Sequence, residues 1–343
     1  MKIYQFIGSR VVKTGVAVFL TALICQWIGW PPVFAVITAI VTIEPTVSDS
    51  IKKGIVRFPA SAIGSAYAVL FISLFGNSPL TYTMAAVFTI ATCYRLKLHA
   101  GLLVATLTSV AMIEVIHGNF MIAFFTRLGT TTIGLGVSTI VNMFILPPDY
   151  RKLIQKNVTD IKDQTALQIE RIFKAVLTDK LEKTSSMLED LRKLDKDIKQ
   201  TEMLSSFQKD EDKYHPLIET EQEKFQHLQN KLSHLRLIHY HLSNLIHNPL
   251  IDLAWTESER NTILLSVRGL VDSLQDETLF EPDAHSIQLK EITEIFWEDN
   301  EEITKNSEIH PTNFPPELII LYELVSIYDL VAKFYGEKER GAN

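Results

Sequence analysis

Four ionisable side chains lie inside or at the ends of long apolar segments, where a charge is energetically costly and often functional. Arg127 follows the apolar stretch 121–126, which places it ~10 Å inside a helical span at about 1.5 Å per residue. A guanidinium can bind a carboxylate through two parallel hydrogen bonds. Arg127 is therefore the first candidate for binding an anion. The structural alternatives are an ion pair with Glu114 across the turn at 117–119, or a side chain that reaches the membrane surface.

Arg57 is the second candidate for substrate binding. It lies close to Lys52 and Lys53, so it also fits a charged anchor at the membrane edge. Glu44 and Glu114 each end an apolar run. Burial raises the pKa of a carboxyl group and a nearby arginine lowers it again, so either glutamate could carry a proton. For both glutamates, proton coupling and a static ion pair with an arginine stay open as interpretations.

Metal and catalytic chemistry have little support in the sequence. Cys25 and Cys93 both lie within apolar runs, and His227, His234 and His241 recur every seven residues. That spacing separates neighbouring imidazoles by ~10 Å along a helix, too far to share one ion. No HExxH or GxxxxGK[ST] motif is present. We therefore expect no metal, no cofactor and no enzyme activity.

The charges are distributed very unevenly along the 343 residues. Residues 1–150 hold 9 basic and 4 acidic side chains, whereas residues 151–343 hold 24 basic and 36 acidic ones. Three runs carry no charge at all: 14–43, 58–94 and 128–148. Since a membrane-spanning helix needs ~20 apolar residues, these runs exclude a wholly soluble enzyme. The net charge of −7, with dispersed basic residues, argues against nucleic-acid binding.

We expect an all-α protein with a six-helix transmembrane domain in residues 1–148 and a cytoplasmic antiparallel helical bundle in residues 149–343. The expected spans are 11–30, 33–43, 57–75, 80–94, 100–116 and 121–146. The second and fourth are short, so they could be partial helices that neighbouring helices bury. The bundle is expected to contain a long helix over 151–207, a loop at 209–213, a heptad-patterned helix after Pro216, and helices at 257–279, 288–296 and 316–335.

Basic residues lie on alternate sides of the expected spans. They precede the first span, separate spans two and three and spans four and five, and follow the sixth: Lys2, Arg10, Lys13, Lys52, Lys53, Arg57, Arg95, Lys97, Arg151, Lys152 and Lys156. The three intervening turns contain no lysine or arginine. The positive-inside rule therefore predicts that both termini are cytoplasmic.

The membrane half repeats itself at an offset of 70 residues. The matched positions are Ala35, Thr38, Ile43, Glu44, Arg57, Ile63 and Gly64, against Ala105, Thr108, Ile113, Glu114, Arg127, Ile133 and Gly134. Three helices per copy is an odd number, so this pattern indicates a 3+3 inverted repeat, with coincidence in an apolar composition as the alternative. Small residues also recur in step: Ala60, Gly64 and Ala68 against Thr130, Gly134 and Ser138. We expect these rows to pack helices closely and spans three and six to form the central pair.

Two stretches resemble the aromatic acid exporter family, the fusaric acid resistance-like membrane proteins. Residues 29–46, GWPPVFAVITAIVTIEPT, resemble the second span of that family, and residues 127–134, RLGTTTIG, resemble its Arg-x-x-Gly-Thr-x-x-Gly span start. Arg57-Phe58-Pro59-Ala60 departs from this form. Six spans followed by a cytoplasmic helical domain are similar to the short Gram-positive members. The resemblance implies proton-driven efflux of small aromatic carboxylates across a bacterial plasma membrane.

We therefore expect a multi-pass exporter of small organic anions in the bacterial plasma membrane, in contact with the lipid bilayer and assembled as a homo-oligomer. Arg127 and Arg57 would attract the carboxylate, and Glu44 or Glu114 would couple transport to protons. Plant malate channels belong to the same broad superfamily, so a passive organic-anion channel is one alternative. A membrane-anchored scaffold whose helical domain recruits partners is another.

Overall fold

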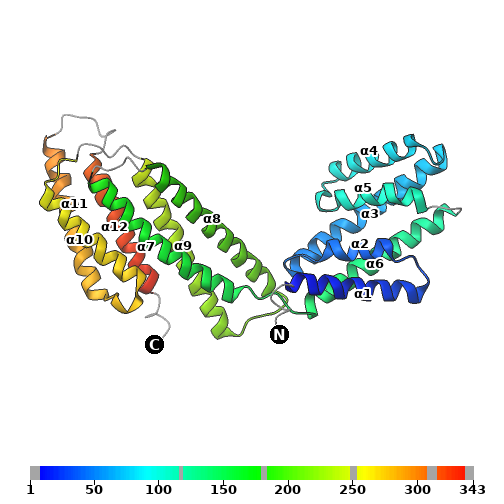
Figure 1. Ribbon diagram of the computed structural model, residues 1–343, viewed down its shortest axis with the longest axis horizontal. Coiled ribbons are helices and arrows are strands. Elements are labelled where there is room, and N and C mark those ends of the chain that lie inside the picture. Colours follow the sequence, from blue (N-terminus) through cyan, green and yellow to red (C-terminus); the bar gives the residue numbers. More distant parts are fainter. Residues whose placement is uncertain (1–7, 116–118, 179–183, 248–252, 307–314, 337–343) are drawn as a thin grey trace. The chain divides into compact units, whose positions relative to one another are not determined.

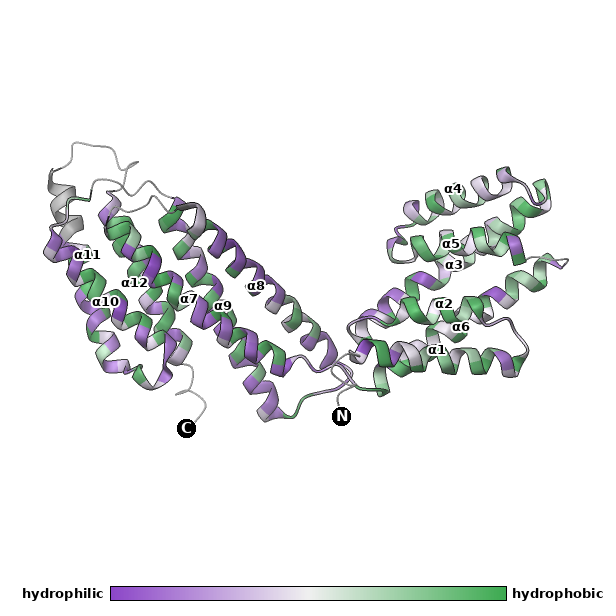
Figure 2. Ribbon diagram, viewed as in Figure 1, coloured by the Kyte–Doolittle hydropathy of each residue, from purple (hydrophilic) through white to green (hydrophobic). Residues whose placement is uncertain are grey.

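The structure is a computed structural model that describes residues 8–115, 119–178, 184–247, 253–306 and 315–336. In these residues the chain forms twelve α-helices (Figure 1), which confirms the all-helical prediction. The chain divides into two compact units. The first unit comprises Met1–Asp149 and Phe207–Pro216, and the second unit comprises Tyr150–Ser206 and Leu217–Asn343. Figure 2 shows the difference in composition: hydrophobic residues dominate the helices of the first unit and alternate with hydrophilic ones in the second.

The first unit contains six helices in the part of the chain that the structure describes. They are α1 (Ser9–Ile28), α2 (Val33–Thr42), α3 (Val47–Phe75), α4 (Pro79–Arg95), α5 (His99–Val115) and α6 (Phe120–Phe144). Helices α1, α3 and α6 are long and apolar enough to cross a membrane, whereas α2 and α5 are apolar but shorter. All six expected spans therefore correspond to helices, and three of these reach the length of a crossing.

The expected start of the third span at residue 57 is wrong, because α3 begins at Val47. The hydroxyl of Thr46 accepts a hydrogen bond from the backbone N–H of Asp49 at 3.0 Å, so Thr46 caps the helix. Lys52 and Lys53, whose charges suggested a loop, lie within the first turns of this helix. A helix end that lies outside the apolar run is invisible to a hydropathy pattern, although the capping residue is a usable signal.

The third helix of each copy packs against the second helix of the other copy. A Cβ atom on Gly64 of α3 would overlap the carbonyl oxygen of Ala105 on α5, and a Cβ on Gly134 of α6 would overlap that of Ala35 on α2. Both glycines therefore permit a backbone approach that no other residue allows. The small-residue rows therefore pack helices closely, as expected, and their neighbours are α5 and α2. Helices α3 and α6 also contact each other.

A polar contact joins helices α3 and α6 where they cross. The hydroxyl oxygens of Ser61 and Thr131 lie 3.3 Å apart, and the two residues are separated by the repeat offset of 70. The helices run in opposite directions (Figure 1). Since the Gly64–Ala105 and Gly134–Ala35 contacts are also related by this offset, the sequence repeat corresponds to a repeated arrangement of contacts in space.

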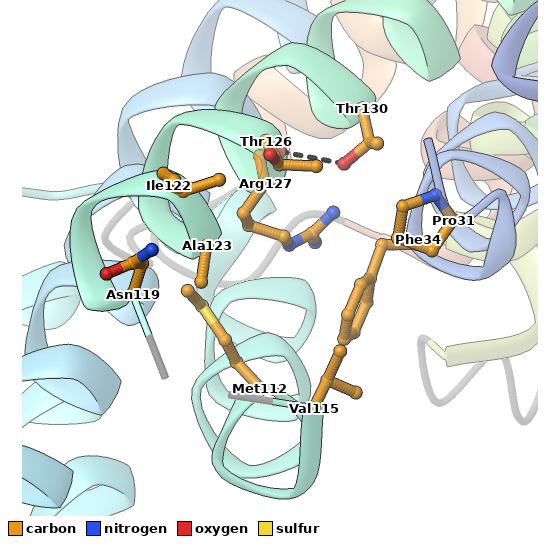
Figure 3. Close-up of a pocket in the computed structure, with 10 residues that line it drawn as sticks. All are labelled: Pro31, Phe34, Met112, Val115, Asn119, Ile122, Ala123, Thr126, Arg127 and Thr130. Carbon is orange, nitrogen blue, oxygen red and sulfur yellow. Dashed lines mark hydrogen bonds between the residues drawn. The ribbon is translucent and has the colours of Figure 1, made fainter. Parts of the chain in front are cut away.

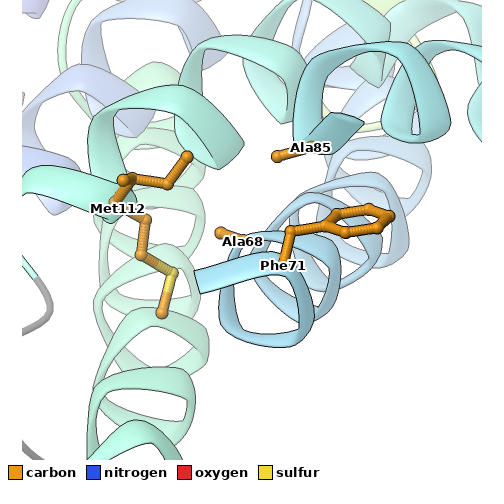
Figure 4. Close-up of a cluster of buried hydrophobic side chains, with 5 residues drawn as sticks. Ala68, Phe71, Ala85 and Met112 are labelled. Atoms are coloured by element: carbon orange, nitrogen blue, oxygen red, sulfur yellow. The ribbon is translucent and has the colours of Figure 1, made fainter. Parts of the chain in front are cut away.

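A small apolar core joins α3, α4 and α5. It contains Ala68, Phe71, Ala85, Met112 and Ile113 (Figure 4). The alanines bring the helices close together, and the Phe71 ring fills the remaining volume and stacks on Tyr67 with 5.9 Å between ring centres. This core fixes the end of α5 that carries Thr108 and Met112, two residues that reach the candidate site described below.

The second unit is built from the helices that follow residue 150. They are α7 (Arg151–Leu177), α8 (Thr184–Glu211), α9 (Glu219–His247), α10 (Glu257–Gln275), a 3-10 turn η3 (Glu277–Leu279), α11 (Pro282–Asn306) and α12 (Pro316–Gly336). The single helix expected over 151–207 is wrong, because α7 ends at Leu177 and α8 begins at Thr184. The expected loop at 209–213 is partly helical, since α8 continues to Glu211.

Apolar side chains on one face of each helix form the core of the second unit. Leu232, Leu235, Leu242 and Leu245 of α9 are all buried, which confirms the heptad-patterned seam. On the outer side of α9, Arg236 bonds Glu202 at 2.6 Å and also pairs with Asp195, which ties α9 to α8. In the part of the chain that the structure describes, no group of three histidine, cysteine or acidic side chains could hold a metal ion.

The buried His285 predicts how the stability of the second unit depends on pH. His285 is 4 % exposed and its Nε2 lies 2.8 Å from the carbonyl oxygen of Tyr328. Burial lowers the pKa of His285 below its ordinary value of 6.5, so the unfolded chain binds this proton more readily than the folded one. The contribution to stability is therefore complete above the unfolded value and falls as the pH drops below it.

We expect the second unit to melt at a lower temperature at about pH 5.5 than at about pH 7.5. His285→Gln should reduce this difference, and His247→Gln, at an exposed position in the last turn of α9, should leave it unchanged. Thermal unfolding of the full chain in detergent, followed by circular dichroism, measures both. A pH dependence that is identical in the His285→Gln variant and the unaltered chain would contradict this assignment.

Candidate anion-binding site

Arg127 lies on α6 with its side chain inside the first unit. The residue is 3 % exposed, so its guanidinium is removed from water almost completely. The hydroxyls of Thr130 and Thr131 both donate to the Arg127 carbonyl oxygen at 2.9 Å, which satisfies polar groups that would otherwise be buried alone. Figure 3 shows the guanidinium pointing away from α6 toward Phe34 of α2.

A cavity of about 340 Å³ adjoins this guanidinium. Its walls come from α2, from the end of α5 and from the first turns of α6: Pro31, Phe34, Met112, Val115, Asn119, Ile122, Ala123, Thr126, Arg127 and Thr130. The Arg127 Cζ atom lies 4.5 Å from the centre of the Phe34 ring, a cation–π contact that also orients the planar group. The cavity thus combines largely apolar walls with the positive charge of Arg127.

The guanidinium of Arg127 is only partly satisfied by the protein. Its Nη2 donates to the Thr108 hydroxyl at 2.6 Å. Its Nε and Nη1 atoms are buried and have no hydrogen-bond partner among the residues that the structure describes. Buried polar groups are nearly always hydrogen-bonded, and a buried charge without a partner is costly. An anion in the cavity would supply the missing acceptors.

Glu114 does not supply that anion. Its carboxylate accepts a hydrogen bond from the Tyr82 hydroxyl of α4. Across the described parts of the chain, no ion pair joins Glu114 to Arg127. The alternative of a Glu114–Arg127 pair that joins α5 to α6 is therefore absent from this structure.

Arg57 is in the opposite situation, because every nitrogen of its guanidinium has a partner. Nη2 donates to Glu44 Oε1 at 2.7 Å, Nη1 to the Val41 carbonyl at 3.0 Å and Nε to the Ala100 carbonyl at 3.2 Å. Lys53 binds the second carboxylate oxygen of Glu44 at 2.9 Å. Burial alone would raise the pKa of Glu44, and the hydrogen bonds from Lys53 and Arg57 outweigh it and hold that pKa below its usual range.

A buried amide that the sequence analysis missed organises the opposite end of α6. Asn142 is fully buried, accepts a hydrogen bond from Lys13 Nζ at 2.8 Å, and donates to Ser50 Oγ at 2.9 Å and to the Thr46 carbonyl at 3.2 Å. Lys13, expected to be a loop charge, lies in α1 and is 4 % exposed. The signal was present, because Asn142 is the only amide side chain within the uncharged run 128–148.

Phe34 and Thr108 also belong to the site and carried no comparable signal. An aromatic residue or a threonine in an apolar segment is ordinary, and each becomes significant only because α2 and α5 approach α6. For α2 that approach depends on the close packing at Gly134, and both approaches are properties of the assembled helices.

Comparison with known proteins identifies the family. Residues 5–145 match the family described as aromatic acid exporter family member 1. The UPF0421 protein of Oceanobacillus iheyensis is 52% identical over 98% of this chain and 97% of its own length. UPF0421 proteins of Bacillus cereus and Staphylococcus haemolyticus are 40% and 38% identical and cover 99% and 97% of the chain, which spans 96% and 98% of their lengths.

These matches extend over both units, and the family match covers the six helices α1 to α6. Together with three helices that are long and apolar enough to span, they make the chain a multi-pass membrane protein in contact with the lipid bilayer. The chain therefore belongs with the UPF0421 proteins of Gram-positive bacteria, and its residues 5–145 form an aromatic acid exporter family domain, which implies a membrane transporter.

Proposed function

We propose that this transporter exports small organic anions, in particular aromatic carboxylates, and that the cavity at Arg127 binds them. The supporting observation is the buried guanidinium with two unpartnered nitrogens at the wall of a cavity. Phe34, Met112 and Ile122 provide apolar surface for a ring, and the volume of about 340 Å³ lies within the range of pockets for small molecules. The family name points to the same class of substrate.

We also propose that α1 to α6 all enter the membrane, with both termini and the second unit in the cytoplasm and with the two three-helix copies inverted relative to each other. The basic residues near the start of α1, in the first turns of α3 and after α4 support this orientation through the positive-inside rule. The short helices α2 and α5 pack closely against α6 and α3 at Gly134 and Gly64, as is expected of partial helices that neighbouring helices support. A homo-oligomer is part of the same proposal.

Proton coupling is the third part of the proposal, with Glu44 and Glu114 as the groups that exchange protons. Each lies at the end of a short apolar helix. The carboxylate of Glu44 accepts a hydrogen bond from Arg57 and that of Glu114 accepts one from Tyr82, and protonation of the carboxylate would weaken these hydrogen bonds. A passive anion channel on the same scaffold is the alternative, and flux measurements separate the two. Uphill movement of benzoate driven by a pH gradient supports coupling, and movement only down its own gradient supports a channel.

Arg127→Gln tests the binding site directly. The glutamine keeps much of the side-chain volume and removes the charge, so the fold should persist. Loss of a charge-assisted hydrogen bond costs ~1.5–3 kcal/mol, which corresponds to a tenfold to hundredfold weaker affinity for benzoate. Arg127→Lys should recover only part of this loss, because lysine lacks the planar fork. Calorimetric titration of the purified full chain with benzoate measures the affinity.

Arg95→Gln is the matched control, since Arg95 is an exposed arginine in the last turn of α4. It should bind benzoate as the unaltered chain does. Melting temperatures of all variants show whether the fold is retained. Unchanged benzoate affinity in a folded Arg127→Gln protein would remove Arg127 from the site and with it the main support for this function.

A further inference from the structure

The two copies of the repeat present the same glutamate–arginine pair in two different arrangements. In the first copy, Arg57 donates to Glu44 at 2.7 Å. In the second copy, Glu114 bonds Tyr82 instead, and two nitrogens of Arg127 have no partner among the described residues. Because the glutamates and the arginines occupy equivalent positions at the offset of 70, one copy shows an arginine that holds a carboxylate and the other an arginine that lacks one.

The difference between the copies has a basis in the sequence. The position equivalent to Tyr82 in the first copy is Val12, which has no hydroxyl group. Glu44 therefore lacks the partner that holds Glu114 away from its arginine, and it binds Arg57 and Lys53. The arrangement at Arg57 is a partly buried carboxylate held by two cations, the chemistry that recognises carboxylate ligands in general.

The Arg57 guanidinium is held in place independently of the glutamate. Its Nη1 and Nε atoms donate to the carbonyl oxygens of Val41 and Ala100, at the ends of α2 and α5 that meet α3. These two bonds fix the plane of the guanidinium and leave Nη2 directed at the carboxylate. The donor would therefore stay oriented if Glu44 moved away.

We propose that Arg57 and Lys53 form a second carboxylate-binding site, which the Glu44 side chain occupies in this structure and which accepts the carboxylate of an organic anion when Glu44 withdraws. This inference rests on the proposed function only in taking the bound anion to be the one that the protein transports. Glu44 then acts as an internal competitor that keeps the site closed until an anion replaces it.

The position of the second site relative to the first follows from the crossing of α3 and α6. Arg57 precedes Ser61 by one helical turn, and Arg127 precedes Thr131 by one turn, which is ~6 Å along each axis. Since the two helices run in opposite directions (Figure 1), the offsets from Ser61 and Thr131 put the arginines on opposite sides of the crossing.

The test uses benzoate binding in a protein whose first site has been removed. Arg127→Gln should bind benzoate weakly. Adding Glu44→Ala, which vacates the second site, should restore binding to within about tenfold of the unaltered chain, because an arginine and a lysine are then available to the carboxylate. Adding Arg57→Gln as a third change should abolish the restored binding. Titration calorimetry on the full chain in detergent measures each affinity.

Glu114→Ala in the Arg127→Gln protein is the matched control, because it removes the equivalent glutamate and vacates no arginine that remains. It should not restore binding. The melting temperature gives a second measurement that remains usable if Glu44→Ala is less stable. Acetate should raise the melting temperature of Glu44→Ala more than chloride does at equal concentration. This difference should vanish in Glu44→Ala/Arg57→Gln.

The outcomes separate this inference from the proposed function. Absence of benzoate binding in the unaltered chain would overturn the Arg127 site, while the comparison of Glu44→Ala with Glu44→Ala/Arg57→Gln would still decide the second site. Another set of results would overturn the second site alone. In that case the unaltered chain binds benzoate, Arg127→Gln abolishes this binding, Glu44→Ala does not restore it, and acetate has no effect on the melting temperature.

Discussion

Replacing Asn142 with leucine is expected to lower the free energy of unfolding of the first unit by ~3–5 kcal/mol, the range for breaking a buried charged interaction. Asn142 is the nearest acceptor of the buried Lys13 ammonium group and also donates to the segment that joins α2 to α3. Leucine has a similar volume, so the loss comes from the stranded polar groups. Thermal or SDS-induced unfolding of the purified chain measures it.

A second variant separates the contribution of the charge. Lys13→Met/Asn142→Leu removes the ammonium group together with its acceptor, so the pair should cost ~1.5–3 kcal/mol less than the sum of the two single changes. Strictly additive losses would show that the Lys13–Asn142 hydrogen bond contributes nothing to stability. This interaction links α1 to α6, the first and last helices of the membrane part, and its loss should also speed proteolysis of the first unit.

Gly134→Ala is expected to destabilise the first unit by ~3 kcal/mol, at the upper end of the cost of overpacking. The added methyl group would overlap the Ala35 carbonyl oxygen and lie 2.9 Å from Thr38 Cβ. Helices α2 and α6 must therefore move apart, which also displaces Phe34 from Arg127. We expect both a lower melting temperature and weaker benzoate binding.

Gly136→Ala is a control two residues along the same helix. A Cβ at Gly136 meets nothing within 4 Å, and alanine favours the helix by ~1 kcal/mol over glycine, so this change should be neutral or stabilising. Gly64→Ala should reproduce the effect of Gly134→Ala, because its added methyl group would overlap the Ala105 carbonyl oxygen. Equal stability of the Gly134→Ala and Gly136→Ala proteins would contradict the close packing of α2 on α6.

The sequence predicted the helices better than it predicted their partners. Uncharged runs and turn residues located all six helices of the first unit. The Ser61–Thr131 contact obeys the repeat offset of 70, but the sequence did not predict it. The same pattern could not show that α3 packs against α5 and α6 against α2, since a row of small residues permits close approach without specifying the neighbour.

The candidate site was predictable to a similar extent. Arg127 was found because a charge inside an apolar run is rare, but the sequence left open whether Glu114 neutralises it. That question depends on Tyr82, which offers Glu114 a different partner. Competition between two partners for one carboxylate is decided by geometry over a few ångströms, and neither hydropathy nor spacing encodes such distances.

The exchange of partners between the two copies constrains how the protein can be made. Helix α2 leaves the ribosome early, yet the face around Ala35 packs against α6, whose Gly134 is synthesised after nearly all of the membrane part. Until then this surface must be shielded by lipid or by the insertion machinery, so the first three helices cannot reach their final packing before α6 has emerged. The same constraint makes the two halves mutually dependent. If the two halves were produced as separate chains, each should fail to reach its final packing alone and should reach it only when the other half is present in the same membrane.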